Sequence, residues 1–330
     1  MQSPTRWSLV GLSVGLAFLW FAMRNANLDA AWQVLRDLHL GWTKAVFAGA
    51  LLFMLIKSLR WAIVLRPVLR APLGLISRTV YVGTAANLIV PHSGEVLRAS
   101  LLARKESVAA SAVLATIAIE RMLDFVALVV LTAVALLIDP RVSPVLWSAG
   151  ALSLAFVLLG LAVVTMLMRP RPIFRRWGQS ALRLLPSRLR RWVAHQVTRG
   201  VAGLGSLSDP IAVLKLLALS VLQWACIVAA IWACARAVGI TIPLSGAIAV
   251  FVLTVIGLTL PSSPAQLGTI QLAFVAGLEL VDADPANAFA ASVVYTLFVN
   301  VAMMVIGGIC WFASDWVRPA RPAAGSAPHA

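Results

Sequence analysis

Three charged side chains, Glu120, Arg121 and Asp124, lie within the longest apolar segment of the sequence, Val108 to Ile138. At about 1.5 Å per residue of helix, they are roughly 18 to 24 Å from the start of that segment, near its middle. Placing an Asp or Arg at the centre of a membrane-spanning helix costs on the order of 2.5–3.5 kcal/mol, so these charges need partners. Glu120 and Asp124 share a helix face, whereas Arg121 points about 100° away from Glu120. The three charges therefore cannot all be neutralised within one helix.

Candidate partners precede this segment, in the stretch HSGEVLRASLLARKE that follows Pro91. Ser93 can cap a helix whose first turn holds Glu95, a favourable position for an acidic side chain. Glu95 and Arg98 are three residues apart and can pair on one helix face. We expect a cavity lined by a polar cluster of Glu95, Arg98, Glu120, Arg121 and Asp124, with Asn87, His92 and Ser93 beside it. The alternative is a purely structural network of ion pairs.

The second half of the sequence has uncharged polar residues in the corresponding places. They are Ser262, Ser263, Gln266, Gln271, Tyr295 and Asn300, of which Asn300 roughly matches Asp124. A site that is charged on one side and hydrogen-bonding on the other suits an amphiphile with a polar or anionic head better than a bare ion. The sequence has no GxxxxGK[ST] phosphate loop, and its three cysteines and four histidines form neither a metal-site pattern nor a nucleophile triad. We therefore expect no cofactor and no metal.

Transmembrane helices are the elements that must position these residues. Hydrophobic residues make up 61% of the chain and charged residues 12%, against roughly 45–50% and about 25% in soluble domains. Runs long enough to cross a bilayer, about 20 residues, recur along the chain. They are Trp7 to Met23, Trp42 to Leu65, Val108 to Ile138, Val145 to Met168, Ile211 to Ala235 and Ala286 to Phe312. The sequence predicts an all-α polytopic membrane protein, one domain of residues 1–312 with a disordered tail at 313–330.

The net charge of +15 is concentrated rather than spread over a nucleic-acid-binding face, since nine arginines fall within residues 169–199. By the positive-inside rule, residues 169–210 form a cytoplasmic loop. This loop joins two halves, residues 1–168 and 211–312. Apolar residues in the loop recur at helical spacing opposite Arg175, Arg176 and Arg183, as in a helix at the lipid headgroups. These arginines either contact anionic lipid or only fix the topology, and we expect no nucleic-acid partner.

Two further apolar segments, Leu73 to Val90 and Leu244 to Leu260, end abruptly at Pro91 and Pro261. They either cross the membrane, giving eight spans, or turn back as re-entrant hairpins, giving six. A basic group at the end of the second span, Lys57, Arg60, Arg66 and Arg70, favours six spans with the N-terminus inside. The hairpins then enter from opposite sides, and matching positions around the two prolines indicate an inverted repeat, as in many transporters. Broken helices at membrane depth need a wet cavity or surrounding protein.

The stretch NLIVPHSGEVLRASLLARKESVAASAVLATIAIERMLD, from Asn87 to Asp124, strongly resembles the signature of a flippase-like transmembrane family. That family comprises the membrane region of lysylphosphatidylglycerol synthases and many stand-alone proteins. LPSSPAQLGTIQLAF, from Leu260 to Phe274, is more loosely similar to the second Pro-rich motif of the family. The resemblance covers about residues 7 to 315.

This resemblance implies a lipid flippase or transporter in the bacterial cytoplasmic (inner) membrane, with the basic loop and the C-terminus in the cytoplasm. It implies membrane lipids, anionic or of polyprenyl or hopanoid type, as partners, together with an enzyme of lipid biosynthesis. The alternatives are a scaffold or accessory subunit of a hopanoid, glycolipid or aminoacyl-lipid pathway and, less favoured, an intramembrane transferase. Because the chain stops at Ala330 without the soluble aminoacyl-transferase domain of the synthases, we expect it not to be an enzyme.

Overall fold

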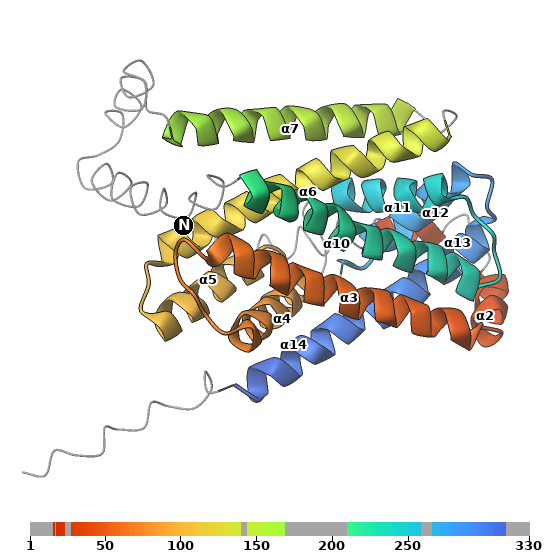
Figure 1. Cartoon of the computed structure of the whole chain (residues 1–330). Helices are drawn as coiled ribbons and strands as arrows, with labels where there is room; N and C mark the ends of the chain where they lie inside the picture. Colours follow the sequence, from red (N-terminus) through yellow and green to blue (C-terminus); the bar gives the residue numbers. More distant parts are fainter. Residues whose placement is uncertain are drawn as a thin grey trace, which may run out of the picture.

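The computed structural model describes residues 16, 18–23, 28–139, 144–168, 210–258 and 266–314 (Figure 1). Within these ranges every regular element is a helix, in agreement with the predicted fold class. Five of the residues proposed for lipid contact or substrate binding lie outside these ranges, on the predicted loop or in the second Pro-rich motif. They are Arg175, Arg176, Arg183, Ser262 and Ser263.

The helices of the first half match the predicted apolar segments closely. After the short helix α2 (Leu28–Arg36) come α3 (Leu40–Leu65), α4 (Leu73–Ile89), α5 (Ser93–Glu106), α6 (Ala110–Ile138) and α7 (Pro144–Met168). The second half consists of α10 (Pro210–Ala237), α11 (Leu244–Gly257), α12 (Thr269–Glu279), α13 (Pro285–Tyr295), a π-helical segment η3 (Thr296–Val301) and α14 (Ala302–Phe312). Asp284 caps α13, because its carboxylate accepts hydrogen bonds from two amides of the first turn.

Four of the described helices are long and apolar enough to cross a membrane: α3, α6, α10 and the continuous helix Pro285–Phe312. The apolar stretch described within α7, Leu146–Leu159, is shorter, as are α11 and α12. The chain is therefore a multi-pass membrane protein. The first predicted span, Trp7 to Met23, lies mostly outside the described residues, so the total of six spans stays a prediction.

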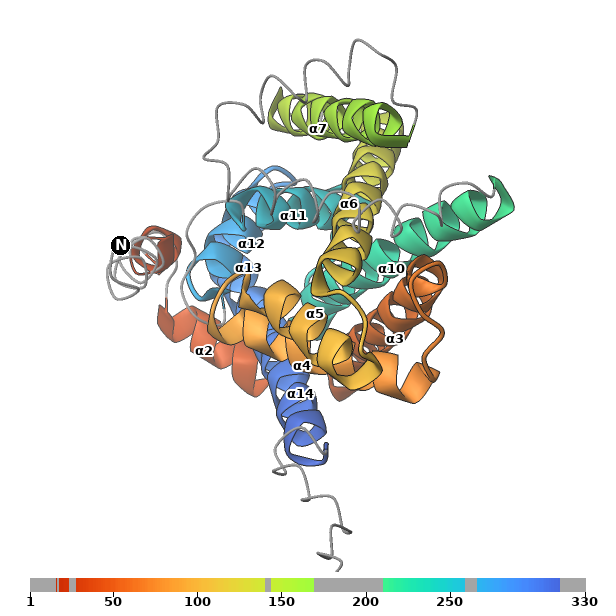
Figure 2. The same ribbon diagram turned by 90° about the vertical axis from the view of Figure 1, so that its left-hand side faces the viewer.

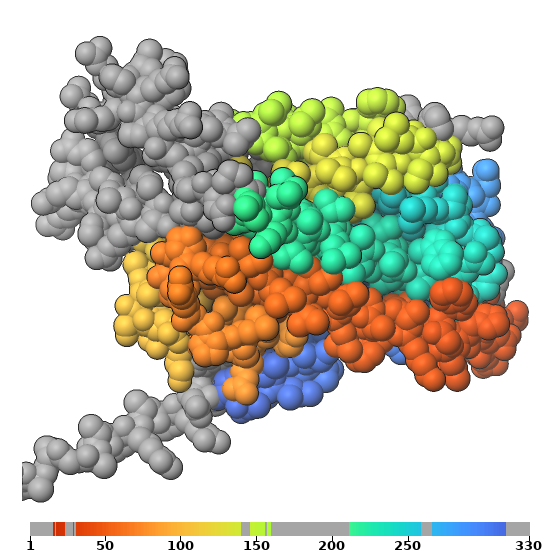
Figure 3. Space-filling view, in the orientation of Figure 1, coloured from red at the N-terminus to blue at the C-terminus, as the bar shows by residue number. Residues whose placement is uncertain are grey.

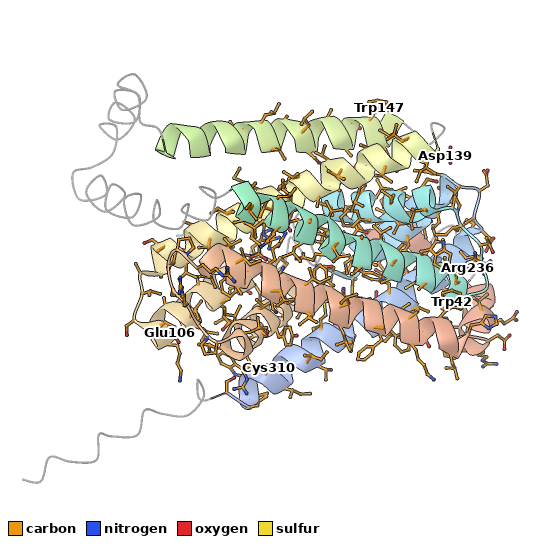
Figure 4. The ribbon with its side chains drawn as sticks, in the orientation of Figure 1. Trp42, Glu106, Asp139, Trp147, Arg236 and Cys310 are labelled. Atoms are coloured by element: carbon orange, nitrogen blue, oxygen red, sulfur yellow. The ribbon has the colours of Figure 1, made fainter. Side chains whose placement is uncertain are left out.

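Helices α3 and α10 run antiparallel along the centre of the molecule, and their surfaces adjoin in the space-filling view (Figure 3). A Cβ atom on Gly49 of α3 would lie 3.2 Å from the backbone oxygen of Cys226, so a small residue allows the close approach. At one end of the pair, the rings of Trp42 and Trp232 pack edge to face with centroids 5.4 Å apart. Trp42 and Arg236 mark this end in Figure 4, and Glu106 and Cys310 mark the opposite end.

The shorter helices of each half pack against the long helix of the other half. Helix α4 contacts α14, where a Cβ atom on Gly307 would lie 2.4 Å from the Cβ atom of Ala85. Helix α11 contacts α6, where the Ser245 hydroxyl lies 3.3 Å from Oδ2 of Asp139. Within each half, α4 contacts α5 and α11 contacts α12. Figure 2 shows α4 and α5 together near α14, α11 and α12 together on the other side, and α7 at the periphery beside α6.

Candidate functional site

The turn between α4 and α5 fixes the start of the site. A residue before proline is restricted to extended backbone, so Val90 leaves the helix with φ −129° and ψ 110°. His92 then adopts a positive φ of 65°, which reverses the chain. The two helices cross so closely that a Cβ atom on Gly94 would lie 1.8 Å from the carbonyl oxygen of Gly83. Only glycine fits at this crossing, and it brings the first turn of α5 against α4.

The side chain of Asn87 links this turn to the charged residues. Its Oδ1 atom accepts a hydrogen bond of 2.6 Å from the Gly94 amide, and its Nδ2 atom donates one of 3.1 Å to Oε1 of Glu95. Asn87 thereby holds the Glu95 carboxylate in place. The expectation that Ser93 caps α5 is wrong, because its hydroxyl donates to the carbonyl oxygens of Ala86 and Val90, at 3.0 and 2.7 Å. Ser93 is the first residue of α5, and His92 precedes it without a side-chain cap.

Glu120 lies at the centre of the site and contacts three cationic side chains. Its Oε1 atom lies 3.1 Å from Nη2 of Arg60 and 3.9 Å from Nζ of Lys57, both on α3. Its Oε2 atom accepts a hydrogen bond from Arg98 of α5. The Arg98 guanidinium also lies 4.6 Å from the ring centroid of Trp61, a cation–π contact. One carboxylate on α6 therefore ties together α3, α5 and α6.

Asp124, one turn further along α6, extends the network toward α10. Its Oδ1 atom lies 2.7 Å from Nη2 of Arg60 and accepts a 2.9 Å hydrogen bond from the indole nitrogen of Trp224. Arg60 also donates from Nη1 to the Ser220 hydroxyl of α10, at 2.9 Å. Because Arg60 contacts both acidic residues of α6, it is the cation that their common helix face requires.

Arg121 points to a different side of α6, as the helical spacing predicts, and pairs with Glu95 of α5. Its Nη1 atom also lies 3.6 Å from Oδ2 of Asp124. The expected pairing of Glu95 with Arg98 is wrong, because each of these residues reaches across to α6 instead, to Arg121 and Glu120 respectively. Partners on a neighbouring helix bury both charges more completely than a pair on the face of one helix. The structure thus brings all five residues of the predicted polar cluster together.

The side chains of this charged cluster differ sharply in exposure. Arg60 and Glu120 are 0% and 1% exposed, and Arg98 is 4% exposed. Glu95 is 17% exposed and Arg121 is 41% exposed. The described cluster counts four cations and three carboxylates, a net charge of +1, when Lys57 is included. It offers charged and hydrogen-bonding groups to a ligand.

Two members of the cluster, Lys57 and Arg60, were not predicted as site residues. They were expected to fix the topology, in a basic group with Arg66 and Arg70. The signal was present, because both lie inside the apolar run Trp42 to Leu65 rather than beyond its end. The same reasoning about the cost of buried charge that selected Glu120 selects them as well. Ser220 and Trp224 gave no such signal, since polar and aromatic side chains are common in membrane helices.

The described polar residues of the second half lie on or beside α12, α13 and η3. Gln271 accepts a 2.6 Å hydrogen bond from the Gly268 amide and donates one of 3.2 Å to the Thr296 hydroxyl. The ring of Tyr295 packs on that of Phe274, with centroids 5.5 Å apart. Asn300 is buried within η3, a π-helical turn of the kind often found at functional sites. Gln266 has a positive φ of 60°, before the start of α12.

Almost the whole chain matches the membrane region of a known protein family. The family described as lysylphosphatidylglycerol synthase TM region matches residues 8–307. This range includes every helix that carries the charged cluster. No curated protein matches the sequence. The chain belongs to the lysylphosphatidylglycerol synthase TM region family.

Proposed function

We propose that this member of the family moves an amphiphilic lipid between the two leaflets of the membrane, with the polar head of the lipid passing the charged cluster. The observation that carries the proposal is the position of the cluster. Glu120 is ten residues into α6, about 15 Å along a helix about 43 Å long. Four cations and three carboxylates at that depth are costly in lipid, so such residues mark pathways for polar substrates in membrane proteins.

We also propose that the two halves contain an inverted repeat, in which each repeat has two long helices and one re-entrant hairpin between them. Each half contains a long helix, two shorter helices in contact and a second long helix, in the same order. Helices α3 and α10 run in opposite directions, as do α6 and the continuous helix α13–α14 (Figure 1). The reciprocal contacts of α4 with α14 and of α11 with α6 fit a pseudo-twofold axis in the membrane plane.

The distribution of charge supports a cytoplasmic location for the ends of α3 and α5. Arg66 and Arg70 follow α3, and Arg104 and Lys105 lie in the last turn of α5. The opposite end of the molecule carries an acidic turn, in which Asp282 and Asp284 follow Glu279, the last residue of α12. By the positive-inside rule, the first end faces the cytoplasm, and the membrane is the inner membrane of a bacterium in this proposal.

The test is lipid movement in liposomes that contain the purified protein. A fluorescent lipid is placed in both leaflets, and a membrane-impermeant quencher reports how much of it reaches the outer leaflet. We expect movement with the native protein and at least about a tenfold slower rate for Glu120→Gln, with Glu279→Gln as the exposed control. If no lipid moves, whatever its headgroup, and a chemically altered lipid is formed instead, the protein is a transferase. Neither movement nor a product would identify a scaffold.

A further inference from the structure

The charged cluster consists of a buried centre and one partly exposed ion pair, which we call the open pair. In the centre, Glu120 is surrounded by Lys57, Arg60 and Arg98, none of which is more than 12% exposed. The open pair is Arg121 with Glu95, and Arg121 is 41% exposed. The charge that a ligand can reach is therefore that of Arg121, whereas the three other cations already face the carboxylates of α6.

A partly exposed arginine side chain at this position requires polar surroundings. Arg121 is eleven residues into α6, about 16 Å from its start, and an arginine facing lipid at such depth is strongly unfavourable. Arg121 therefore faces water or the polar part of a ligand. Arginine binds phosphate through two parallel N–H donors, the geometry that it also uses for carboxylate.

The Glu95 carboxylate occupies the place of such an anion in this structure. It is held by Asn87 at 3.1 Å as well as by Arg121, and its Oε2 atom has no hydrogen-bond partner among the described residues. When Glu95 leaves, Arg121 keeps a second partner, Asp124 at 3.6 Å, which holds the guanidinium in position. Glu95 can thus be exchanged for another anion without leaving Arg121 unpaired.

We propose that the phosphate group of an anionic phospholipid binds Arg121 by displacing Glu95, which makes Arg121 a residue that selects the substrate headgroup. The net charge of +1 over the described cluster favours an anionic over a neutral head. Displacement removes one of the two ion pairs between α5 and α6 and leaves the other, Arg98 with Glu120. This inference rests on the proposed function, since it names the lipid class that the transporter accepts.

The test is equilibrium binding of fluorescent phosphatidylglycerol and phosphatidylcholine to the purified full chain in neutral detergent. Arg121→Gln removes the guanidinium that binds the phosphate. We therefore expect this variant to bind phosphatidylglycerol about tenfold more weakly and no longer to prefer it over phosphatidylcholine. Glu95→Gln removes the competing carboxylate, so we expect the opposite, several-fold tighter binding. Lys105→Gln, an exposed charge on α5, serves as the control and leaves both affinities unchanged.

A structural role of the ion pair is separated from anion binding by exchanging its two charges. The double variant Glu95→Arg with Arg121→Glu keeps an ion pair between α5 and α6, and we expect it to fold and to lose the preference for phosphatidylglycerol. Retained preference in this variant, or shifts in the same direction for Arg121→Gln and Glu95→Gln, would overturn the proposal. So would inorganic phosphate that competes as strongly as the lipid, because the site would then serve a free anion.

The liposome assay distinguishes failure of this inference from failure of the proposed function. Native protein that moves lipid without the expected binding shifts refutes the role of Arg121 and leaves transport standing. Binding shifts of the expected sign in a protein that moves no lipid refute transport and leave the anion site standing.

Discussion

Replacing Glu120 by Gln is expected to destabilise the folded protein by about 3 kcal/mol, the lower end of the cost of breaking a buried ion pair. The structure sets this value, because Glu120 is 1% exposed and faces Arg60 at 3.1 Å as well as Arg98. Neutralising it leaves Arg98 and Lys57 without a carboxylate partner among the described residues, whereas Arg60 keeps Asp124 at 2.7 Å. Glutamine has the same volume and can still accept one hydrogen bond, so the larger costs, up to about 5 kcal/mol, are not expected.

The assay is thermal and denaturant unfolding of the purified protein in detergent, followed with a thiol-reactive dye. Cys226 and Cys234 are 7% and 0% exposed, so they react when the helices separate. Glu279→Gln, the same chemical change at an exposed position, is expected to change the free energy of unfolding by less than about 0.5 kcal/mol. If Glu120→Gln has the same free energy of unfolding as Glu279→Gln, the ion pairs of Glu120 do not stabilise the fold and the reasoning is refuted.

Three further predictions follow from single contacts. Gly307→Ala is expected to destabilise by several kcal/mol because the new methyl group meets α4 at 2.4 Å, whereas Gly308→Ala, with open space, is neutral; unfolding curves compare them. Asp284→Ala removes the cap of α13 and is expected to cost about 1 kcal/mol, and an unchanged unfolding midpoint would contradict this. Trp224→Phe removes the 2.9 Å bond to Asp124 and is expected to cost about 1.5–3 kcal/mol, measured by the same dye.

Much of the charged cluster could be predicted because charge is rare in apolar segments. Glu120, Arg121 and Asp124 could not all pair within one helix, and that requirement led to Glu95 and Arg98 on the neighbouring segment. The helix ends were predictable for a similar reason, since proline and polar residues interrupt long apolar runs. Helix α4, for example, ends one residue before the predicted end at Val90.

The individual partners could not be predicted from spacing alone. Glu95 and Arg98 are correctly spaced for a pair on one helix, but α6 lies close enough to offer each a partner of opposite charge. Arg60 was expected to fix the membrane topology because it lies five residues from the end of α3. Its role depends on α3, α6 and α10 meeting at one point, and a linear sequence does not state which helices meet.

The contact between Arg60 and Glu120 has a consequence for how the protein is made. The two residues are 60 positions apart in the chain, and synthesis proceeds at roughly 5–20 residues per second. Helix α3 therefore leaves the ribosome about 3 to 12 seconds before the carboxylate that neutralises it is available. During that interval Arg60, near the end of its helix, can reach the lipid headgroups with its long side chain. Helix α3 can therefore reach its final position in the bilayer only after α6 has been synthesised. This protein thus inserts in successive steps.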